Sequence, residues 1–441
     1  MNATKIPITI FVSLHPIYDD YQNVRRAGMP SIEKTVHFYS RNSTTVFYIC
    51  GSDEMFLCCN QHKIGNLSIF SIGKRLIPRH IKNVPHFISF LVSHAENLIW
   101  SVGACFYAFY ITISHGFVPF QHHLNTHQAK RNKHATHYQR GIVYAQFGPS
   151  FLSSLMLQHL YGLTRVGRLY GCFFLDHFKK YKLLAVVPYW GEILLVLSRP
   201  KLLVLTDDGS DALTFAKNLG YPADRIFFKP NGVDLRPCSY RFILNHRLSR
   251  SHSLGVRPIQ LLACTRLEKW KGIHLLVDAL SYFVSNYSDF TPFHLVIVGS
   301  GPYERIISEK VQSLSLSSCI TMLPMMEQSD LVDYYLTADL YCSFYLPTNV
   351  GNPLFESRLH GLPTLTVNTG QTSQYVNHLR DSFVCESHAS LHICEGLNYY
   401  LSDIDNLVAH QQNAIEHAWH TIPDWNDRLS KELQFINTKI S

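Results

Sequence analysis

Two short loops in the sequence carry residues that suit a phosphate-containing ligand. The first, TRLEKWKG, places Arg266 and Lys271 five residues apart, directly after the apolar run IQLLAC. Two cations at the carboxyl end of a strand can hold a diphosphate through charge-assisted hydrogen bonds. Arginines and lysines in loops are usually solvated charges. The pair therefore indicates a phosphate site only when other phosphate-binding features accompany it.

The second loop, TNVGNPLFE, reads as the start of a helix. Pro353 suits the first turn, where its missing N–H costs nothing, and Asn352 is the predicted N-cap. Free N–H groups and the positive end of the helix dipole attract an anion such as phosphate. Glu356, one turn later, adds a carboxylate that can accept hydrogen bonds from a ribose diol. An ordinary capped helix with a half-exposed glutamate is the alternative.

A third signal is VIVGSGP, where a predicted strand leads into Gly299 and Gly301. Gly-x-Gly is weak alone, because the third glycine of the dinucleotide fingerprint is absent.

These segments follow strands in a repeating pattern. Short apolar runs alternate with helix-like stretches, which predicts parallel sheets covered by helices. The predicted strands are ITIFVS, TVFYIC, GIVYAQ, VGRLYG, KLLVLT, IQLLAC, FHLVIVG, CITML, DLYCSF and PTLTV. Segment 236–258 is polar and basic without a clear period, and we expect a linker there. The sequence therefore predicts an α/β protein of two Rossmann-like domains, with ligands bound beyond the carboxyl ends of the strands.

The order of the motifs resembles retaining nucleotide-sugar glycosyltransferases of the GT-B fold, specifically glycosyltransferase family 4. The family pattern GRL…EKG, vGxGP, aDl and EGFGLPLLEAmacGLPVv corresponds to TRLEKWKG, VGSGP, ADLYCSF and TNVGNPLFESRLHGLPTL. The resemblance is good over 200–436 and faint over 1–200. It implies an acceptor domain at 1–240, a nucleotide-sugar donor domain at 241–420, parallel sheets facing across a cleft, and a helix at 421–441 that returns to the first domain.

The resemblance also implies roles for residues. The donor-binding set is Arg266, Lys271, Gly299, Gly301, Asn349, Gly351, Asn352, Pro353, Leu354 and Glu356, of which Arg266, Lys271 and Asn349 would act in catalysis. Segment LPMMEQ (323–328) is where the base would sit. On the acceptor side the weaker candidates are Gln146, Arg168, Tyr170 and Gly171, with packing at the edge of the core as the alternative.

The sequence departs from the family at one of two glutamates that normally lie eight residues apart. Position 348 is threonine, so only Glu356 remains. The amides of Asn349 and Asn352 both donate and accept hydrogen bonds, and a subset with N-x-G-N…E is the closest match. The Gly-Gly near the first strand is reduced to Ala27–Gly28.

The implied activity is retaining transfer of a hexose-type sugar from a nucleoside diphosphate sugar to a glycan or lipid-linked acceptor, in surface polysaccharide biosynthesis. Fixed cations and helix N–H groups stabilise a leaving diphosphate without a metal, so we expect no cofactor and no metal. The alternatives are a non-catalytic nucleotide-sugar binding protein and a nucleotide-sugar epimerase of the same fold.

Composition and charge indicate in which part of the cell the protein works. The 441 residues, 46% hydrophobic, suffice for two domains, and eleven scattered cysteines without CxxC fit a reducing cytosol. Between residues 55 and 175 the only acidic residue is Glu96, which favours an anionic membrane leaflet or anionic substrate over a merely solvated face. The apolar run 97–113 is short for a membrane span, so we expect a buried helix.

We therefore expect a cytoplasmic protein, peripheral on the inner face of the membrane, with no nucleic-acid partner. Lys130, Arg131 and Lys133 are the basic residues proposed for liposome contact. Five histidines surround them, at 122, 123, 127, 134 and 137. Their spacing matches no zinc pattern, and we expect a basic loop near the acceptor.

Overall fold

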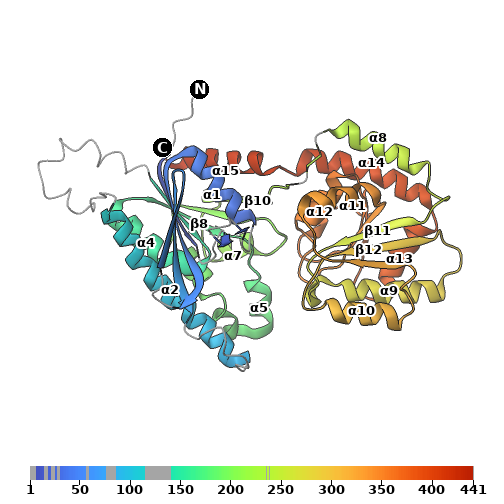
Figure 1. The fold of residues 1–441 in the computed structure, drawn as a ribbon, viewed down its shortest axis with the longest axis horizontal. Coiled ribbons are helices and arrows are strands. Elements are labelled where there is room, and N and C mark those ends of the chain that lie inside the picture. Colours follow the sequence, from blue (N-terminus) through green and yellow to red (C-terminus); the bar gives the residue numbers. More distant parts are fainter. Residues whose placement is uncertain are drawn as a thin grey trace, which may run out of the picture. The chain divides into compact units, whose positions relative to one another are not determined.

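The computed structural model describes residues 6–13, 18–20, 25–26, 30–55, 59–75, 86–114, 141–234, 236–237 and 239–440. The chain divides into two compact units (Figure 1). Unit 1 comprises 1–206, 211–229 and 429–441, and unit 2 comprises 207–210 and 230–428. Each unit has its own sheet and core, which confirms the predicted α/β class with two parallel-sheet domains.

Unit 1 is built on an eight-stranded sheet in the order β10-β9-β8-β7-β1-β4-β6-β5. Its strands are β1 (Ile6–Ser13), β4 (Ser43–Met55), β5 (Cys59–Ile64), β6 (Leu67–Arg75), β7 (Ile142–Gln146), β8 (Thr164–Leu169), β9 (Leu202–Thr206) and β10 (Ile226–Lys229). All neighbours pair in parallel except β5 and β6, which are antiparallel. A separate antiparallel pair is formed by β2 (Tyr18–Asp20) and β3 (Arg25–Arg26).

Helices cover the large sheet on both faces (Figure 1). They are α1 (Pro30–Asn42), α2 (His86–Ser114), α4 (Phe151–Tyr161), α5 (Phe174–Tyr181), α6 (Trp190–Leu197), α7 (Ala212–Asn218) and α15 (Trp425–Ile440), with 3-10 turns η2 (Gly148–Ser150), η3 (Lys182–Val186) and η4 (Ala223–Arg225). The apolar run 97–113 lies in α2, as expected for a helix. Trp100 and Ala104 of α2 are buried in the core, whereas Phe106 is 72% exposed.

Unit 2 has a six-stranded parallel sheet in the order β13-β12-β11-β14-β15-β16. The strands are β11 (Ile259–Cys264), β12 (Phe293–Val298), β13 (Ile320–Leu323), β14 (Leu340–Ser343), β15 (Thr364–Val367) and β16 (Ser382–Cys385). The order of strands reverses between β11 and β14. The loops that follow these two neighbours therefore open side by side at a topological switch point, where open α/β sheets bind ligands.

The helices of unit 2 surround this sheet. They are α8 (Tyr240–Ser251), α9 (Ile273–Asn286), α10 (Glu304–Ser313), α11 (Leu331–Thr337), α12 (Asn352–Leu359), α13 (Ser390–Leu401) and α14 (Ile404–Thr421), with 3-10 turns η5 (Lys269–Lys271), η6 (Gln328–Asp330) and η7 (Thr372–Gln374). The core gathers apolar residues of β11, β12 and β14 with α9 and α13.

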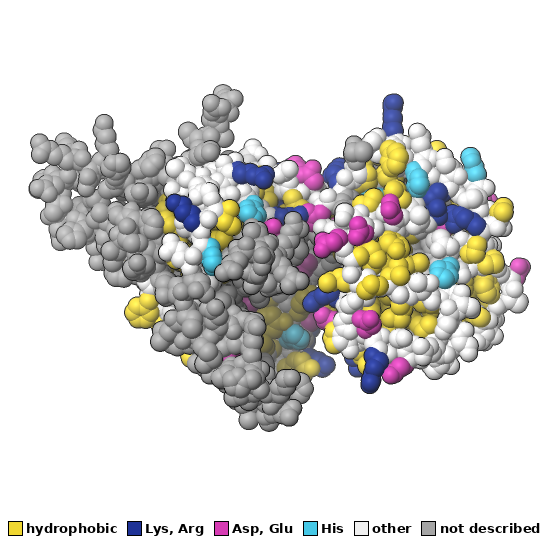
Figure 2. Space-filling view, viewed as in Figure 1, with side chains coloured by type: hydrophobic (Ala, Val, Ile, Leu, Met, Phe, Trp, Pro, Cys, Tyr) yellow, Lys and Arg dark blue, Asp and Glu magenta, His cyan; other side chains and the backbone are white. Residues whose placement is uncertain are grey.

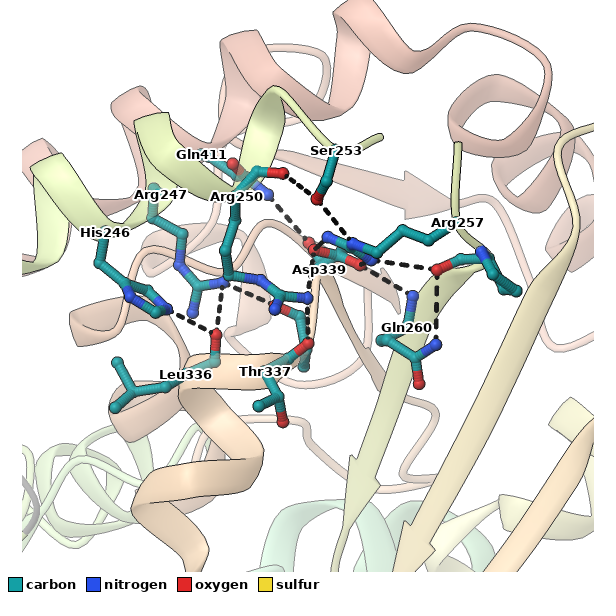
Figure 3. A network of polar contacts seen from close by, with 12 residues as sticks. His246, Arg247, Arg250, Ser253, Arg257, Gln260, Leu336, Thr337, Asp339 and Gln411 are labelled. Carbon is teal, nitrogen blue, oxygen red and sulfur yellow. Dashed lines mark hydrogen bonds and ion pairs between the residues drawn. The ribbon is translucent and has the colours of Figure 1, made fainter. Parts of the chain in front are cut away.

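The segment predicted as a linker contains α8, of which Arg247 and Arg250 form hydrogen bonds inside unit 2 (Figure 3). The buried Arg247 guanidinium donates to the carbonyl oxygens of Ala338 (2.6 Å) and His360 (2.7 Å), just beyond α11 and α12. Burial lowers the Arg247 pKa to about 9. Asp339, buried before β14, accepts two hydrogen bonds from Arg257 at 2.6 and 2.8 Å. Arg247 therefore satisfies carbonyl groups beyond two helix ends, and Arg257 pairs with a buried carboxylate; neither role leaves an apolar period in the sequence.

Candidate functional site

The switch point of unit 2 holds a pocket of about 170 Å³. Its lining comes from the loops after β11 and β12, the loop before α11 and the start of α12: Cys264, Thr265, Arg266, Val298, Gly299, Ser300, Met325, Met326, Leu331 and Pro353. The three segments selected from the sequence, and the methionines of LPMMEQ, therefore meet at one place. Arg266 and Pro353 line the same pocket.

The loop after β11 presents two cations of different character. The side chain of Arg266 is 67% exposed, and its guanidinium lies 3.1 Å from the Glu268 carboxylate. Lys271 is half-buried, with its ammonium 4.0 Å from the ring centroid of Trp270 and 3.7 Å from that of Tyr345. Burial, followed by the nearby charge of Arg266, lowers the Lys271 pKa to about 7. Within the described part of the chain Lys271 has no carboxylate in salt-bridge contact, so an anion between the two cations would relieve their repulsion.

Glycines let the loops after β11 and β12 lie directly against each other. Gly299 has φ 152°, and a Cβ there would collide with the carbonyl oxygen of Thr265. A Cβ at Gly301 would collide with the carbonyl oxygen of Leu267, whose amide donates to the Ser300 carbonyl at 3.0 Å. Gly299 lines the pocket, whereas Gly301 supports the loop that does.

The start of α12 has no side-chain cap. Gly351 occupies the N-cap and Asn352 is the first helical residue, so the predicted capping role of Asn352 is wrong. The backbone of Gly351 is extended at φ −178°, and a Cβ there would meet only Pro353 Cδ, at 3.9 Å. Neither conformation nor packing in unit 2 requires glycine at 351, which fits close approach by a ligand. Leu354 is buried in the core, so only its backbone faces this end of the helix.

Asn349, predicted as a donor-binding and catalytic residue, lies buried inside unit 2. Its Oδ1 accepts from Ser343 Oγ (2.9 Å) and the Tyr345 amide (2.8 Å), and its Nδ2 donates to the Val367 carbonyl (2.9 Å) and Thr369 Oγ1 (2.8 Å). These four bonds use the amide's ordinary capacity. Asn349 therefore ties the ends of β14 and β15 to the loop before α12, and we assign it a positioning role.

Glu356 is also buried, at 2% exposure, and does not line the pocket. Its carboxylate accepts from Gln328 Nε2 at 2.9 Å and from Tyr335 OH at 3.1 Å. Gln328 begins η6, two residues after Met326 of the pocket, and sequence reasoning had not singled out its side chain. Only its place at the end of LPMMEQ pointed to it.

The threonine at 348 has a structural explanation. Thr348 Oγ1 donates to the Asp208 carbonyl oxygen at 3.0 Å, in the segment 207–210 that groups with unit 2. A Cβ on Gly209 would collide with Thr348 Oγ1, so the packing is tight. An ionised glutamate at 348 could not donate to that carbonyl and is larger. Burial raises the pKa of Asp208 to about 6.

In unit 1, Arg168 is buried. Its guanidinium is buried and ion-paired with Glu432 of α15 at 2.8 Å. Tyr39 OH, at 3.2 Å, and Tyr144 OH donate to the same carboxylate. The charge of Arg168 thus anchors α15, which fits the alternative of packing at the edge of the core.

The other acceptor-side candidates end β7 and follow β8. Gln146 is fully buried at the end of β7, and neither amide atom has a hydrogen-bond partner among the described residues. The next residue, Phe147, has φ 67°, and its ring stacks on Tyr170 at 4.9 Å. Gly171 follows with φ 157°. Positive φ at a non-glycine residue is a form of strain that collects at functional sites.

Several predictions lie outside the described residues: the histidines at 122, 123, 127, 134 and 137, the basic residues Lys130, Arg131 and Lys133, and Ala27–Gly28. In the parts of the chain that are described, no group of three or more His, Cys, Asp or Glu is placed to hold a metal ion. Over the same residues, no helix is both long and apolar enough to cross a membrane.

Part of the chain is similar to known glycosyltransferases. Residues 246–418 match the family model Glycosyl transferases group 1. A D-inositol 3-phosphate glycosyltransferase of Pseudarthrobacter chlorophenolicus is 26% identical over 187 residues, 42% of this chain and 44% of that one. The chain spans less than two thirds of the length of the first curated relatives it matches.

Solved structures show the fold over the whole chain. Sucrose-phosphate synthase from Thermosynechococcus elongatus has a TM-score of 0.64 at 14% identity, covering 98% of both chains. Anabaena HepE, in complex with UDP and glucose, has a TM-score of 0.61 at 13% identity, covering 97% of this chain and 99% of its own. The protein therefore has the GT-B fold.

Proposed function

We propose that the protein moves a hexose-type sugar from a nucleoside diphosphate sugar to a glycan or lipid-linked acceptor, with retention at the anomeric carbon. The observation that carries this proposal is that Arg266 and the uncapped start of α12 line one pocket at the switch point of unit 2. The UDP complex of a GT-B neighbour supports a nucleotide donor.

In the proposed reaction, the bond between the anomeric carbon and the diphosphate oxygen lengthens and negative charge builds on the diphosphate. Arg266, Lys271 and the free N–H groups at the start of α12 are donors for that charge and would stabilise the transition state. Arg266 would exchange the Glu268 carboxylate for the diphosphate. The acceptor hydroxyl attacks from the face of the leaving group, and its proton passes to the departing phosphate oxygen. This route needs no covalent nucleophile and no metal.

The proposal includes a place in the cell. A glycan or lipid-linked acceptor for a surface polysaccharide would be met at the cytoplasmic face of the membrane. Because residues 55–175 include only one acidic residue among many lysines and arginines, this region would be attracted to an anionic leaflet.

A non-catalytic nucleotide-sugar binding protein is the second candidate. It is favoured by the burial of Asn349 and Glu356 and by threonine at 348, which leave no carboxylate on the pocket lining. An epimerase of the same fold is a third. Transfer requires an acceptor, epimerisation does not, and a binding protein turns over no donor.

The test begins with a thermal-shift panel of nucleoside diphosphate sugars, because a bound donor raises the unfolding temperature. With the donor found, Arg266→Ala and Lys271→Ala should each lower kcat/KM for transfer at least tenfold, which is about 1.4 kcal/mol of transition-state stabilisation. The exposed Lys269→Ala, on the same turn, is the matched control. Unchanged kinetics in both variants would refute the diphosphate clamp.

A further inference from the structure

Helix α5 and the turn η3 form an exposed apolar surface on unit 1. No residue of the eight in α5 is buried. Just beyond it, Leu183 and Leu184 are 77% and 75% exposed. We define the α5–η3 surface by its exposed apolar residues and the lysines among them: Phe178, Tyr181, Leu183, Leu184, Val186, Val187, Lys179, Lys180 and Lys182.

Neighbouring contacts hold this segment on the unit. The Phe174 ring lies 5.3 Å from that of Phe215 in α7. Tyr189 OH is 2.7 Å from His177 Nδ1, and Ala185, the fourth residue of η3, is buried. The leucines beside Ala185 therefore point outward from an anchored backbone. At the place of α5 in Figure 1, Figure 2 shows hydrophobic side chains next to Lys and Arg side chains.

The positive charge on the α5–η3 surface indicates that its binding partner is anionic. Lys179, Lys180 and Lys182 lie among the apolar residues, and Lys180 Nζ is 5.0 Å from the Tyr181 ring centroid. Asp176 pairs with Lys179 at 3.3 Å and leaves two lysines of the surface without an acidic partner among the described residues. Amphipathic segments with lysines beside Leu, Phe and Tyr enter the headgroup layer of anionic bilayers.

We propose that the α5–η3 surface docks the protein on an anionic membrane leaflet, with its leucines in the acyl boundary and its lysines at the phosphates. A second copy fits less well, because a two-fold contact would set the same lysines against each other. Helix α5 begins five residues after β8 ends, at the carboxyl edge of the unit 1 sheet. This docking rests on the proposed function in one respect: it would bring a lipid-linked acceptor to that edge.

The experiment measures sedimentation of the full chain with phosphatidylcholine vesicles that contain or lack about one third phosphatidylglycerol. Leu183→Ser/Leu184→Ser should lower the partition coefficient on anionic vesicles at least tenfold. Lys180→Gln/Lys182→Gln should lower it about tenfold at low salt, with a smaller loss at high salt, because salt screens exposed charges. Matched controls are Leu391→Ser, an exposed leucine of α13, and Lys217→Gln, an exposed lysine of α7.

Three outcomes would overturn the proposal. The first is that both double variants bind anionic vesicles as strongly as the unmodified protein. The second is loss of binding only in Lys130→Glu/Arg131→Glu/Lys133→Glu, which would assign the contact to that basic stretch. The third is a concentration-dependent dimer, seen by analytical ultracentrifugation, that Leu183→Ser/Leu184→Ser abolishes. The donor-induced thermal shift, measured in every variant, should stay parental, so failure of docking is distinguished from failure of the donor site.

Discussion

At the scale of single residues, Lys271 is the most unusual group of the candidate site. An ammonium between two aromatic rings gains cation–π attraction, but it also loses water and faces the charge of Arg266. Its charged form is therefore held weakly in the free protein. A diphosphate would supply the missing counter-charge, which makes the protonation of Lys271 a reporter of donor binding.

Donor binding should therefore depend on pH through Lys271. Its pKa is lowered to about 7 in the free protein, and a bound diphosphate raises the pKa again. Above pH 7 the free protein has lost a proton that the complex retains, so donor affinity should fall, by up to tenfold per pH unit. Calorimetric titration at pH 8 in buffers of different ionisation enthalpy should show uptake of about one proton.

Lys271→Arg is the control for this prediction, because arginine stays protonated throughout the range. Its affinity profile should be flat where that of the parent falls. Equal proton uptake by the parent and by Lys271→Met would show that another group titrates.

Single residues of the site differ in how well their positions could be predicted from the sequence. Arg266 and Pro353 could be brought together in advance, because each follows a strand and carboxyl ends of parallel strands share one edge. Asn349 and Glu356 could not be judged in the same way. Each hydrogen-bonds to at least one partner 18 to 28 residues away, such as Val367 for Asn349 and Gln328 for Glu356. Burial by such distant partners leaves no local pattern in the sequence.

At the scale of elements, α12 is held from its far end. Arg358, two residues after Glu356, donates to both oxygens of Asp381, at 3.2 and 2.8 Å, and both side chains are buried. His417 of α14 lies 3.1 Å from the same carboxylate. The start of α12 in the pocket is thus fixed by an ion pair that joins α12 to the start of β16 and to α14.

Asp381→Asn should lower the free energy of unfolding by about 3–5 kcal/mol, because it leaves the Arg358 charge buried without its counter-ion. Hydrogen bonds from His417 and the charge of Arg358 outweigh burial and hold the Asp381 pKa well below its usual range. This stability is present above the unfolded pKa, near 4, and is lost as pH falls further. Denaturant titrations at pH 7 and at pH values well below 4 measure this loss.

Glu416→Gln, which changes an exposed carboxylate next to His417 on α14, should cost a few tenths of a kcal/mol. A similar loss in both variants would mean that the Arg358–Asp381 pair contributes little net stability.

Elements were predicted well where apolar runs were long and poorly where polar residues serve packing. Most parallel strands follow apolar runs, because both faces of such sheets are covered. Strands β6, β10 and β16 were not predicted. Strand β5, CNQHKI, is polar and lies at the edge of the unit 1 sheet, where one side pairs with β6. Helix α8 was missed because its arginines satisfy carbonyl groups, a role that no periodicity reveals.

At the scale of the whole molecule, each unit holds its own sheet, core and buried ion pair. In unit 1 that pair is Arg168 and Glu432, and in unit 2 it is Arg358 and Asp381. The pocket assigned to the donor belongs to unit 2 alone. A nucleotide in that pocket therefore acts on the stability of one unit directly.

Scanning calorimetry should resolve two unfolding transitions that respond to different changes. A nucleoside diphosphate at 100 times its Kd should stabilise unit 2 by about 2.7 kcal/mol and raise one transition only. Asp381→Asn should lower that same transition. Glu432→Gln should lower the other, because it leaves the buried Arg168 guanidinium beside a neutral amide. If one transition moved as a whole in all three cases, the units would unfold as a single cooperative body, and the independence inferred from their separate cores would be wrong.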